Sequence, residues 1–203
     1  MFDEKRLLKA IENAEKYGVT LIFDEIMFAV LTDGWLAETP RGRLLDEYRT
    51  VLGHIVEVLG YIPETEIVSV RKAKGEYVIE HPMPEVISGS IALFKAGRDL
   101  CDVKYTGLTF GAPLFQTPNG TIVRCAVPGA NPGGKPRLTE RGVLISADSD
   151  NGEAVWCLTH RPRADMSSER EMQLWRHLEA VRWNEWDEPD TDGEIEGQEV
   201  IGE

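Results

Sequence analysis

Acidic residues are concentrated in residues 184–203, and their distribution divides the chain into two parts. These twenty residues contain nine Asp and Glu residues and no Lys or Arg. The whole chain has a formal net charge of −13, of which the segment carries −9 and residues 1–183 carry −4. A segment with few apolar residues and many like charges cannot bury enough surface to fold alone. We therefore expect a single folded domain over residues 1–183 and a flexible acidic C-terminal tail over residues 184–203.

The acidic tail is the first candidate binding site. It is not uniformly hydrophilic, because Trp186, Ile195, Val200 and Ile201 interrupt the acids. Acids with spaced apolar anchors suit a peptide that docks on a basic groove, and opposite charge speeds such association. A solubilising terminus without a partner is the alternative interpretation. The residues predicted to contact a basic partner are Glu185, Trp186, Asp187, Glu188, Asp190, Asp192, Glu194 and Glu196.

The body has the composition of an ordinary globular domain, with 42% hydrophobic residues in the chain as a whole. A chain of 203 residues can form one such domain without disulfides or a metal. Its three cysteines are odd in number and widely spaced, which argues against a disulfide framework and for a reducing cytoplasm. The first residues lack a signal-peptide pattern, and no apolar run is long enough to span a bilayer. We expect a cytoplasmic protein with neither a membrane partner nor a cofactor.

The N-terminal half is predicted to be mostly helical. Apolar residues recur at helical spacing over residues 7–17, and Gly18 ends that run. A short helix is expected over residues 24–33, and Thr39 and Pro40 begin a longer one that runs to Leu59. Residues 67–79 have the pattern of a β-hairpin, and Pro84 begins a helix that ends before Gly97.

Strands are predicted to dominate from residue 102 to residue 160. Residues 114–123 form one expected hairpin, which turns at Asn119 and Gly120, and residues 143–158 form another. Ser168, with Glu171 three residues later, matches a capping box that begins a final helix. Segregated helices and hairpins favour an α+β fold. The predicted architecture is a helical N-terminal half packed on a mainly antiparallel sheet, with the last helix closing the domain.

One motif suggests phosphate binding but is incomplete. Residues Gly129 to Lys135 read G-x-x-x-x-G-K, the start of a loop in which backbone amides hold phosphates. The motif continues with Ser or Thr and a helix, whereas this chain has Pro136 and returns to a strand-like run. A mobile connection between strands is the simpler interpretation, although Lys135 and Arg137 can still contact an anion.

Two basic loops are candidates for binding nucleic acid or another anion. One contains Arg71, Lys72 and Lys74, and the other contains Lys135, Arg137 and Arg141. Clustered Lys and Arg side chains are what phosphate binding needs. The net-negative body and the lack of an aromatic RNA-binding motif argue against nucleic acid, and solvated turns are the alternative. The weak anion-binding prediction comprises Arg71, Lys72, Lys74, Lys135 and Arg137.

The cysteines and histidines form no complete catalytic or metal motif. Cys157 and His160 have the C-x-x-H spacing of a zinc site, but Cys101 and Cys125 are isolated in the sequence. Cys125 and Cys157 lie in apolar runs, where a buried thiol is the ordinary outcome. His54 lies on the polar side of its predicted helix and is expected to face solvent. We therefore predict no metal site.

Three functions of different classes remain. The first is an acidic protein-interaction module, in its strictest form an inhibitor that occupies the nucleic-acid-binding surface of a partner, as phage anti-defence proteins do. The second is a small cytoplasmic enzyme for an anionic or phosphorylated substrate, with the Gly129 to Lys135 loop holding the anion and His81 or His160 as the base. The third is a nucleic-acid-binding protein that uses the two basic loops and is autoinhibited by the tail. The charge distribution favours the first.

Overall fold

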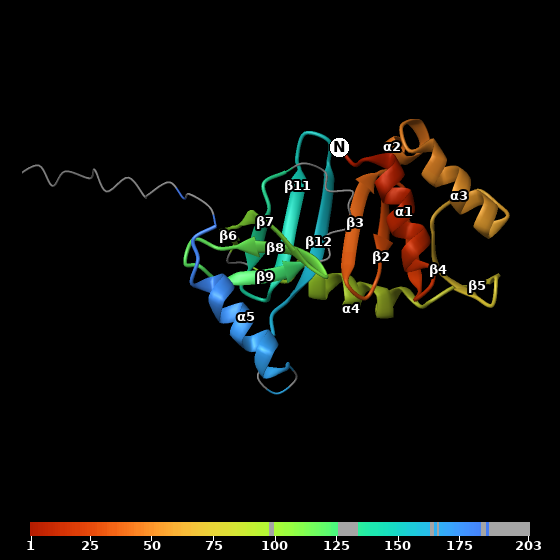
Figure 1. The fold of residues 1–203 in the computed structure, drawn as a ribbon. Helices are drawn as coiled ribbons and strands as arrows, with labels where there is room; N and C mark the ends of the chain where they lie inside the picture. The colour runs from red at the N-terminus through yellow and green to blue at the C-terminus, as the bar shows by residue number, and fades with distance from the viewer. Residues whose placement is uncertain (98–99, 126–133, 163–164, 166, 184–185, 187–203) are drawn as a thin grey trace, which may run out of the picture.

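The computed structural model describes residues 1–97, 100–125, 134–162, 165, 167–183 and 186, which form five helices and twelve strands (Figure 1). The helices are α1 (Glu4–Ala14), α2 (Arg41–Asp46), α3 (Arg49–Leu59), α4 (Pro84–Lys95) and α5 (Glu169–Glu179). The strands are β1 (Val19–Phe23), β2 (Met27–Leu31), β3 (Trp35–Pro40), β4 (Glu66–Ala73), β5 (Glu76–Glu80), β6 (Leu100–Asp102), β7 (Lys104–Phe110), β8 (Ala112–Gln116), β9 (Ile122–Cys125), β10 (Arg137–Thr139), β11 (Val143–Asp148) and β12 (Glu153–His160). No helix in these ranges is long and apolar enough to cross a membrane.

Antiparallel pairing joins all the described strands into one large sheet. Nine strands follow the order β5-β4-β1-β2-β3-β12-β11-β10-β6. Strands β7, β8 and β9 branch from this order, because β9 pairs with the end of β12 and places Arg124 opposite His160. Strand β3 pairs with β12, with Ala37 opposite Val155, and so connects the strands of the two halves of the chain. The predicted mixture of helices and a mainly antiparallel sheet is therefore confirmed.

The prediction of a helical N-terminal half is wrong, because β1 to β5 all lie within residues 19–80. The clearest error concerns residues 24–33, where residues 27–31 form β2 instead of a helix. Phe28 and Val30 belong to the core beneath α1 and α3, whereas Ala29 and Leu31 belong to the core beneath α4. A strand buried on both faces has a continuous apolar sequence, which periodicity cannot distinguish from a buried helix.

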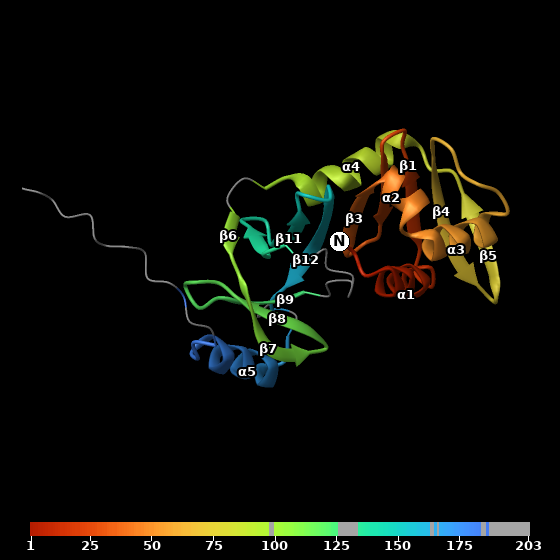
Figure 2. The same ribbon diagram turned by 90° about the horizontal axis from the view of Figure 1, so that it is seen from above.

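The helices cover the two faces of the sheet unequally. Helices α1, α2 and α3 lie over one face, and α4 crosses the opposite face (Figure 2). The core beneath α1 and α3 includes Leu7, Ile11, Leu21, Val30, Val51, Ile55 and Val68. The smaller core beneath α4 comprises Ala29, Leu31, Leu36, Ile87, Phe94 and Val143. Thr20 and Ser69 lie on the α4 face and remain half-buried, so α4 leaves part of this face open.

The helix predicted for residues 39–59 is split into α2 and α3 by a turn before Tyr48. Thr39 does not cap a helix, since its hydroxyl donates a hydrogen bond of 3.2 Å to Glu153 Oε1. The ring of Tyr48 is buried in the core, which explains why the chain turns there. Gly60 ends α3 with a φ of +81°, as the sequence predicts for a glycine that follows a helix.

The predicted elements of the second half are present. Strands β8 and β9 form one hairpin, and β11 and β12 form the other. Ser168 caps α5, because its Oγ accepts a hydrogen bond of 3.2 Å from the N–H of Glu171. Helix α5 packs on the β8–β9 hairpin through Trp175, whose indole N–H donates to the carbonyl of Ile122 at 3.3 Å. This contact holds α5 against β8 and β9, which together with β7 form a small sheet that branches from the main strand order.

Candidate functional site

A cavity of about 710 Å³ lies between α4 and the sheet, in the part of the face that α4 leaves open. This volume is within the range of small-molecule and peptide pockets. Helix α4 contributes Ile87 and Phe94 to its wall. Strands β1 and β4 contribute Thr20 and Ser69, whose hydroxyl oxygens lie 2.8 Å apart in a hydrogen bond. The cavity therefore combines apolar walls with a pair of hydroxyl groups.

Charged side chains of both signs line the same cavity. Arg71 comes from β4 and Arg141 from the turn between β10 and β11. Glu80, at the end of β5, and Asp33, in the turn between β2 and β3, are the lining carboxylates. Arg71 pairs in register with Val78, and Ser69 pairs with Glu80, so Arg71 and Glu80 are diagonal neighbours on one face. The lining is electrically balanced, with one arginine from each of two distant parts of the sheet.

The backbone that carries Arg141 is held in place by several hydrogen bonds. Gly142 has a φ of +74°, and its N–H donates to the carbonyl of Thr139 at 3.0 Å. The N–H of Val143 donates to Thr139 Oγ1 at 3.1 Å, and the N–H of Thr159 donates to the carbonyl of Gly142 at 2.8 Å. A position with positive φ favours glycine, which explains Gly142 at this turn. Arg141 is thus presented to the cavity from a defined turn.

The predicted anion-binding residues do not form one patch. Arg71 lines the cavity, whereas Lys72 packs its ammonium 4.9 Å from the ring centroid of Tyr77. Lys74 lies in the turn between β4 and β5 with a φ of +54°. Lys135 is exposed before β10, and Arg137 Nε lies 3.3 Å from an oxygen of Asp102. Strands β4 and β10 are each next to last at opposite ends of the strand order. The structure instead brings together Arg71 and Arg141, one from each predicted basic loop.

The phosphate-loop motif falls mostly outside the described residues, which include only Gly134 and Lys135 of the Gly129 to Lys135 run. The carbonyl of Gly134 accepts a hydrogen bond of 2.9 Å from Ser146 Oγ. A Cβ atom at position 134 would lie 1.8 Å from the carbonyl oxygen of Ala147, so only glycine fits this approach. Neither Gly134 nor Lys135 lines the α4 cavity. The close packing on β11 explains Gly134 without a ligand.

Of the acidic segment the structure describes only Trp186, together with Trp183 directly before the segment. The indole N–H of Trp183 donates to the carbonyl of Leu178 at 2.8 Å, and its backbone N–H donates to Gln116 Oε1 at 3.0 Å. Lys104 Nζ lies 4.8 Å from the ring centroid of Trp186, a cation–π distance. A second cavity, of about 300 Å³, is lined by Gln116 and Trp186 among others. The other predicted partner-binding residues, Glu185, Asp187, Glu188, Asp190, Asp192, Glu194 and Glu196, lie outside the described residues.

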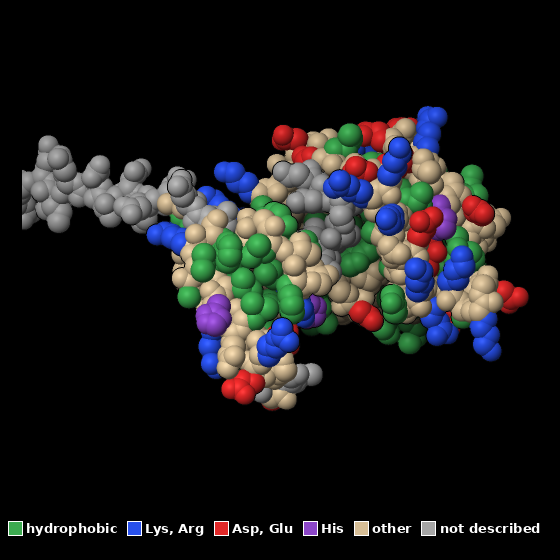
Figure 3. Space-filling model, viewed as in Figure 1, with side chains coloured by type: hydrophobic (Ala, Val, Ile, Leu, Met, Phe, Trp, Pro, Cys, Tyr) green, Lys and Arg blue, Asp and Glu red, His purple; other side chains and the backbone are tan. Residues whose placement is uncertain are grey.

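The visible surface of the body carries mixed charge. Figure 3 shows Lys and Arg side chains interspersed with Asp and Glu over the region of α1 and α3. Apolar side chains gather over the small sheet of β7 to β9, where Tyr105 and Phe110 are exposed. On this side the body therefore has no large patch of purely positive or purely negative side chains, in agreement with its net charge of −4. The highest density of charge in the sequence is in the acidic segment.

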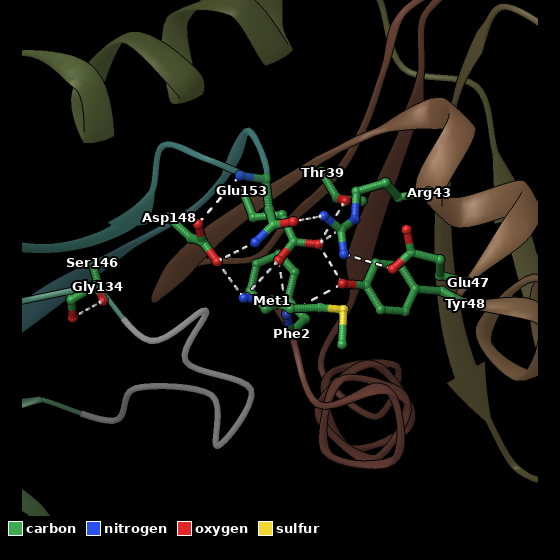
Figure 4. A network of polar contacts seen from close by, with 11 residues as sticks. Met1, Phe2, Thr39, Arg43, Glu47, Tyr48, Gly134, Ser146, Asp148 and Glu153 are labelled. Carbon is green, nitrogen blue, oxygen red and sulfur yellow. Dashed lines mark hydrogen bonds and ion pairs between the residues drawn. The ribbon is translucent and has the colours of Figure 1, made fainter.

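A buried polar network ties the start of the chain to β3, α2 and β12 (Figure 4). Its centre is Glu153, whose side chain is 0% exposed. Oε1 of Glu153 accepts hydrogen bonds from the hydroxyls of Tyr48 and Thr39, and Oε2 accepts one of 2.8 Å from the N–H of Phe2. Nε of Arg43 lies 3.3 Å from Oε1 without hydrogen-bond alignment, so this contact is an ion pair. Both carboxylate oxygens are occupied by the protein, which indicates a structural role.

The network shifts the pKa values of several of its groups, among them Tyr48 and Asp148. Burial and the hydrogen bond to Glu153 raise the pKa of Tyr48 well above its ordinary value. Hydrogen bonds from the Met1 ammonium group and from Asn151 lower the pKa of Asp148 to about 2. Sequence reasoning missed Glu153, although a signal existed: it is an acid directly before the apolar run of residues 154–158. Its partners, however, come from three other parts of the chain.

The histidines do not converge on the cavity. His81 is exposed on the segment before α4, with Nδ1 3.9 Å from Glu66 Oε2, and His160 is exposed at the end of β12. His54 is not solvated as expected, because its side chain is only 15% exposed and Nε2 lies 2.6 Å from Glu15 Oε1. Glu15 is itself buried, and His54 lies on the side of α3 that faces it. The imidazole therefore gains a hydrogen bond by turning inward.

The three cysteines do not form a common site. Cys125 and Cys157 are buried where β9 and β12 meet, and a hydrogen bond that the Cys157 thiol donates to Cys125, together with burial, raises the pKa of Cys157. Cys101 is exposed on β6. Among the described residues, no group of three or more His, Cys, Asp or Glu side chains is arranged to hold a metal ion. Buried thiols in a packed core are consistent with the apolar runs in which they lie.

Comparison with known proteins gives no relative from which a role could be transferred. No protein-family model, curated protein or solved structure matches this chain.

Proposed function

We propose that this protein is an interaction module whose acidic segment, residues 184–203, binds a basic surface on a partner protein. The observation that carries the proposal is the separation of charge: nine acids and no base in the segment, against a body of net charge −4. Such a segment attracts a basic surface over a long range and repels nucleic acid and anionic lipid. Opposite charge raises the rate and specificity of association more than its strength.

The contacts of Trp183 and Trp186, where the body meets the acidic segment, support a role in binding. Trp186 is half-buried and lies against Lys104, and Trp183 is hydrogen-bonded to α5 and β8. These contacts place Trp186 against Lys104 of β7, the strand that also carries the exposed side chains of Tyr105 and Phe110. A partner that contacts the segment can therefore also contact apolar side chains of the body. In the strictest form of the proposal, the partner's basic surface is one that normally binds nucleic acid, and the protein acts as an inhibitor.

The test compares three full-length proteins as bait in host lysate, at low and at high salt. They are the natural chain, a variant with every Asp and Glu of residues 184–203 changed to Asn or Gln, and a control in which nine exposed acids of the body are neutralised instead. The nine are Glu12, Glu25, Asp46, Glu57, Glu64, Glu76, Glu140, Asp150 and Glu169. The proposal expects a basic protein that only the natural chain and the control retain, and that salt releases. Duplex DNA or RNA should compete for that protein if the inhibitor form holds. Identical protein lists for all three baits would refute the proposal.

A second candidate function is the binding of a small anionic molecule in the α4 cavity. The observation that favours it is that Arg71 and Arg141, one from each predicted basic loop, line one cavity of about 710 Å³. Asp33 and Glu80 line it too, which favours a ligand that carries hydroxyl groups beside its anion. Nucleic-acid binding through the two basic loops gains no comparable support, because Lys72 packs over the ring of Tyr77 and Arg137 is paired with Asp102.

Sugar phosphates and inorganic phosphate are the probes for this second function. Arg71→Gln and Arg141→Gln should each weaken binding in calorimetry, because each removes a charge-assisted hydrogen bond. Arg49→Gln is the matched control, since Arg49 is exposed on α3 on the other side of the sheet. Equal binding by all three variants, or no heat with any probe, would exclude anion binding in the cavity.

A further inference from the structure

Strand β5 is the last strand at one end of the strand order, and its outer edge has no neighbour among the described strands. Figure 2 shows it at the periphery of the molecule, beyond β4. It spans five residues, Glu76–Glu80, and contains no proline, lysine or bulge. Edge strands are commonly protected by one of these features, because their free N–H and C=O groups can pair with another strand. The edge of β5 is therefore open to an additional strand.

The register shows which backbone groups of β5 face outward. A two-residue turn joins β4 to β5, and the pair of residues that flanks such a turn exchanges hydrogen bonds. The next pair, Lys72 with Tyr77, is therefore not hydrogen-bonded, and the N–H of Lys72 donates instead to the carbonyl of Glu15 at 2.7 Å. The two kinds of pair alternate along the hairpin, so the N–H and C=O groups of Tyr77 and Ile79 point away from β4. These four backbone groups are available to an added strand.

The side chains of β5 define the chemistry of a strand that fits it. Glu76, Val78 and Glu80 share the face that borders the α4 cavity, and the last two of them line it. Both glutamates are exposed, and Val78 is 38% exposed. Neither glutamate forms an ion pair within the part of the chain that the structure describes. Towards an added strand these three residues are at the non-hydrogen-bonded positions, where facing side chains come closest. A base opposite each glutamate and an apolar residue opposite Val78 would complement them.

The same glutamates argue against other occupants of the edge. In full antiparallel overlap of two copies of β5, Glu76 of each copy faces Glu80 of the other, and like charges opposite each other are destabilising. The acidic segment of residues 184–203 is repelled for the same reason. Arg71 and Lys72 belong to β4, so β5 separates these bases from an added strand. The complementary occupant is therefore a basic strand of another protein.

We propose that β5 binds an extended segment of a partner protein by antiparallel strand addition, and that this segment has bases at its first and fifth positions and an apolar residue at its third. The first base faces Glu80, the apolar residue faces Val78, and the second base faces Glu76. Main-chain hydrogen bonds to Tyr77 and Ile79 supply affinity, and the alternate side chains supply specificity. This surface is separate from the acidic segment and does not depend on the function proposed for it.

The probe is a synthetic β-hairpin, cyclised so that its outer strand, Lys-Thr-Val-Thr-Lys, is extended before it binds. The hairpin is added to the isotope-labelled full chain, and amide hydrogen exchange is followed by NMR. In the free protein the N–H groups of Tyr77 and Ile79 should exchange fast, whereas the other three of β5 face β4 and should be protected. The hairpin should slow exchange at Tyr77 and Ile79. If exchange there is unchanged at a hairpin concentration of about 1 mM, the proposal is overturned.

Charge reversal tests the chemistry of the partner. Glu76→Lys combined with Glu80→Lys should weaken binding of this hairpin about tenfold or more, since two attractive cross-strand pairs become repulsive. The same variant should bind a matched hairpin with the outer strand Glu-Thr-Val-Thr-Glu, which the natural chain should not bind. Glu57→Lys combined with Glu140→Lys, at exposed acids away from β5, changes the net charge equally and should leave both affinities unchanged. Equal binding of the two hairpins by the natural chain would contradict the charge argument.

Ile79→Pro tests strand addition itself. The N–H of Ile79 faces the free edge, so proline there keeps the hydrogen bonds to β4, and edge strands tolerate proline in this position. It removes one donor to the added strand, and the hairpin should no longer bind. Ile79→Ala controls for the loss of the apolar side chain and should still bind, and circular dichroism confirms that each variant is folded. If Ile79→Pro does not fold, the exchange at Tyr77 and the charge reversal still decide. Binding that survives in folded Ile79→Pro would show that the hairpin does not pair with β5.

Discussion

Replacement of Glu153 by glutamine should destabilise the protein far more than the loss of a single hydrogen bond. The carboxylate is buried and receives hydrogen bonds from the hydroxyls of Tyr48 and Thr39 and from the N–H of Phe2. Glutamine keeps the shape of the side chain but replaces one acceptor oxygen with an NH₂ group. That group faces other donors, and the guanidinium of Arg43 loses its buried counter-charge.

The size of the effect follows from what Arg43 retains. Removing one partner of a buried ion pair costs about 3–5 kcal/mol. Arg43 keeps Glu47 at 2.6 Å, and its side chain is 15% exposed, so its charge is only partly stranded. We therefore expect Glu153→Gln to lower the free energy of unfolding by about 3 kcal/mol, at the lower end of that range. Thr39→Val removes one neutral hydrogen bond from the same oxygen and should cost about 1 kcal/mol.

Urea unfolding followed by tryptophan fluorescence and circular dichroism measures both variants. The slope of the unfolding free energy against urea should match that of the natural protein, which shows that the difference lies in stability and not in compactness. Adding Tyr48→Phe to each background gives a double-mutant cycle for the Tyr48–Glu153 contact. If Glu153→Gln costs no more than Thr39→Val, the buried charge contributes nothing beyond neutral hydrogen bonds, and the reasoning about Arg43 is refuted.

Three further predictions concern other parts of the fold. The pKa of Asp148 is lowered from its ordinary value of 3.8, so the stability that this carboxylate contributes is present above pH 3.8 and is lost as pH falls toward 2. Asp148→Asn should therefore reduce the loss of unfolding free energy between pH 3.8 and 2. An unchanged loss over this range would contradict the expectation. Gly134→Ala should cost about 1–3 kcal/mol in urea unfolding because its Cβ meets backbone, whereas Gly53→Ala, with open space inside α3, should stabilise by about 0.5–1 kcal/mol; equal effects would show that the approach to β11 is not tight. Iodoacetamide should label Cys101 in the folded protein and the two buried thiols only after unfolding, as peptide mass spectrometry can check; labelling of all three under native conditions would contradict their burial.

Local signals in the sequence predicted the elements whose stability is local. The capping box at Ser168 begins α5, Pro84 begins α4, and Gly60 ends α3, because a cap or a φ requirement acts within a few residues of the chain. The hairpins of the second half were predictable for the same reason. The helix expected over residues 24–33 failed because β2 is buried on both faces, and only the partners β1 and β3 supply the hydrogen bonds that make it a strand.

The sequence by itself determined where the charge lies along the chain, since net charge needs no knowledge of contacts. It also placed Arg71 and Arg141 in two basic loops. Only the tertiary structure decided that these two arginines line one cavity, that Glu153 has partners from β3, α2 and the start of the chain, and that β5 is at one end of the strand order. Long-range pairing of strands sets these neighbours, and sequence spacing carries no record of which distant strands will lie together.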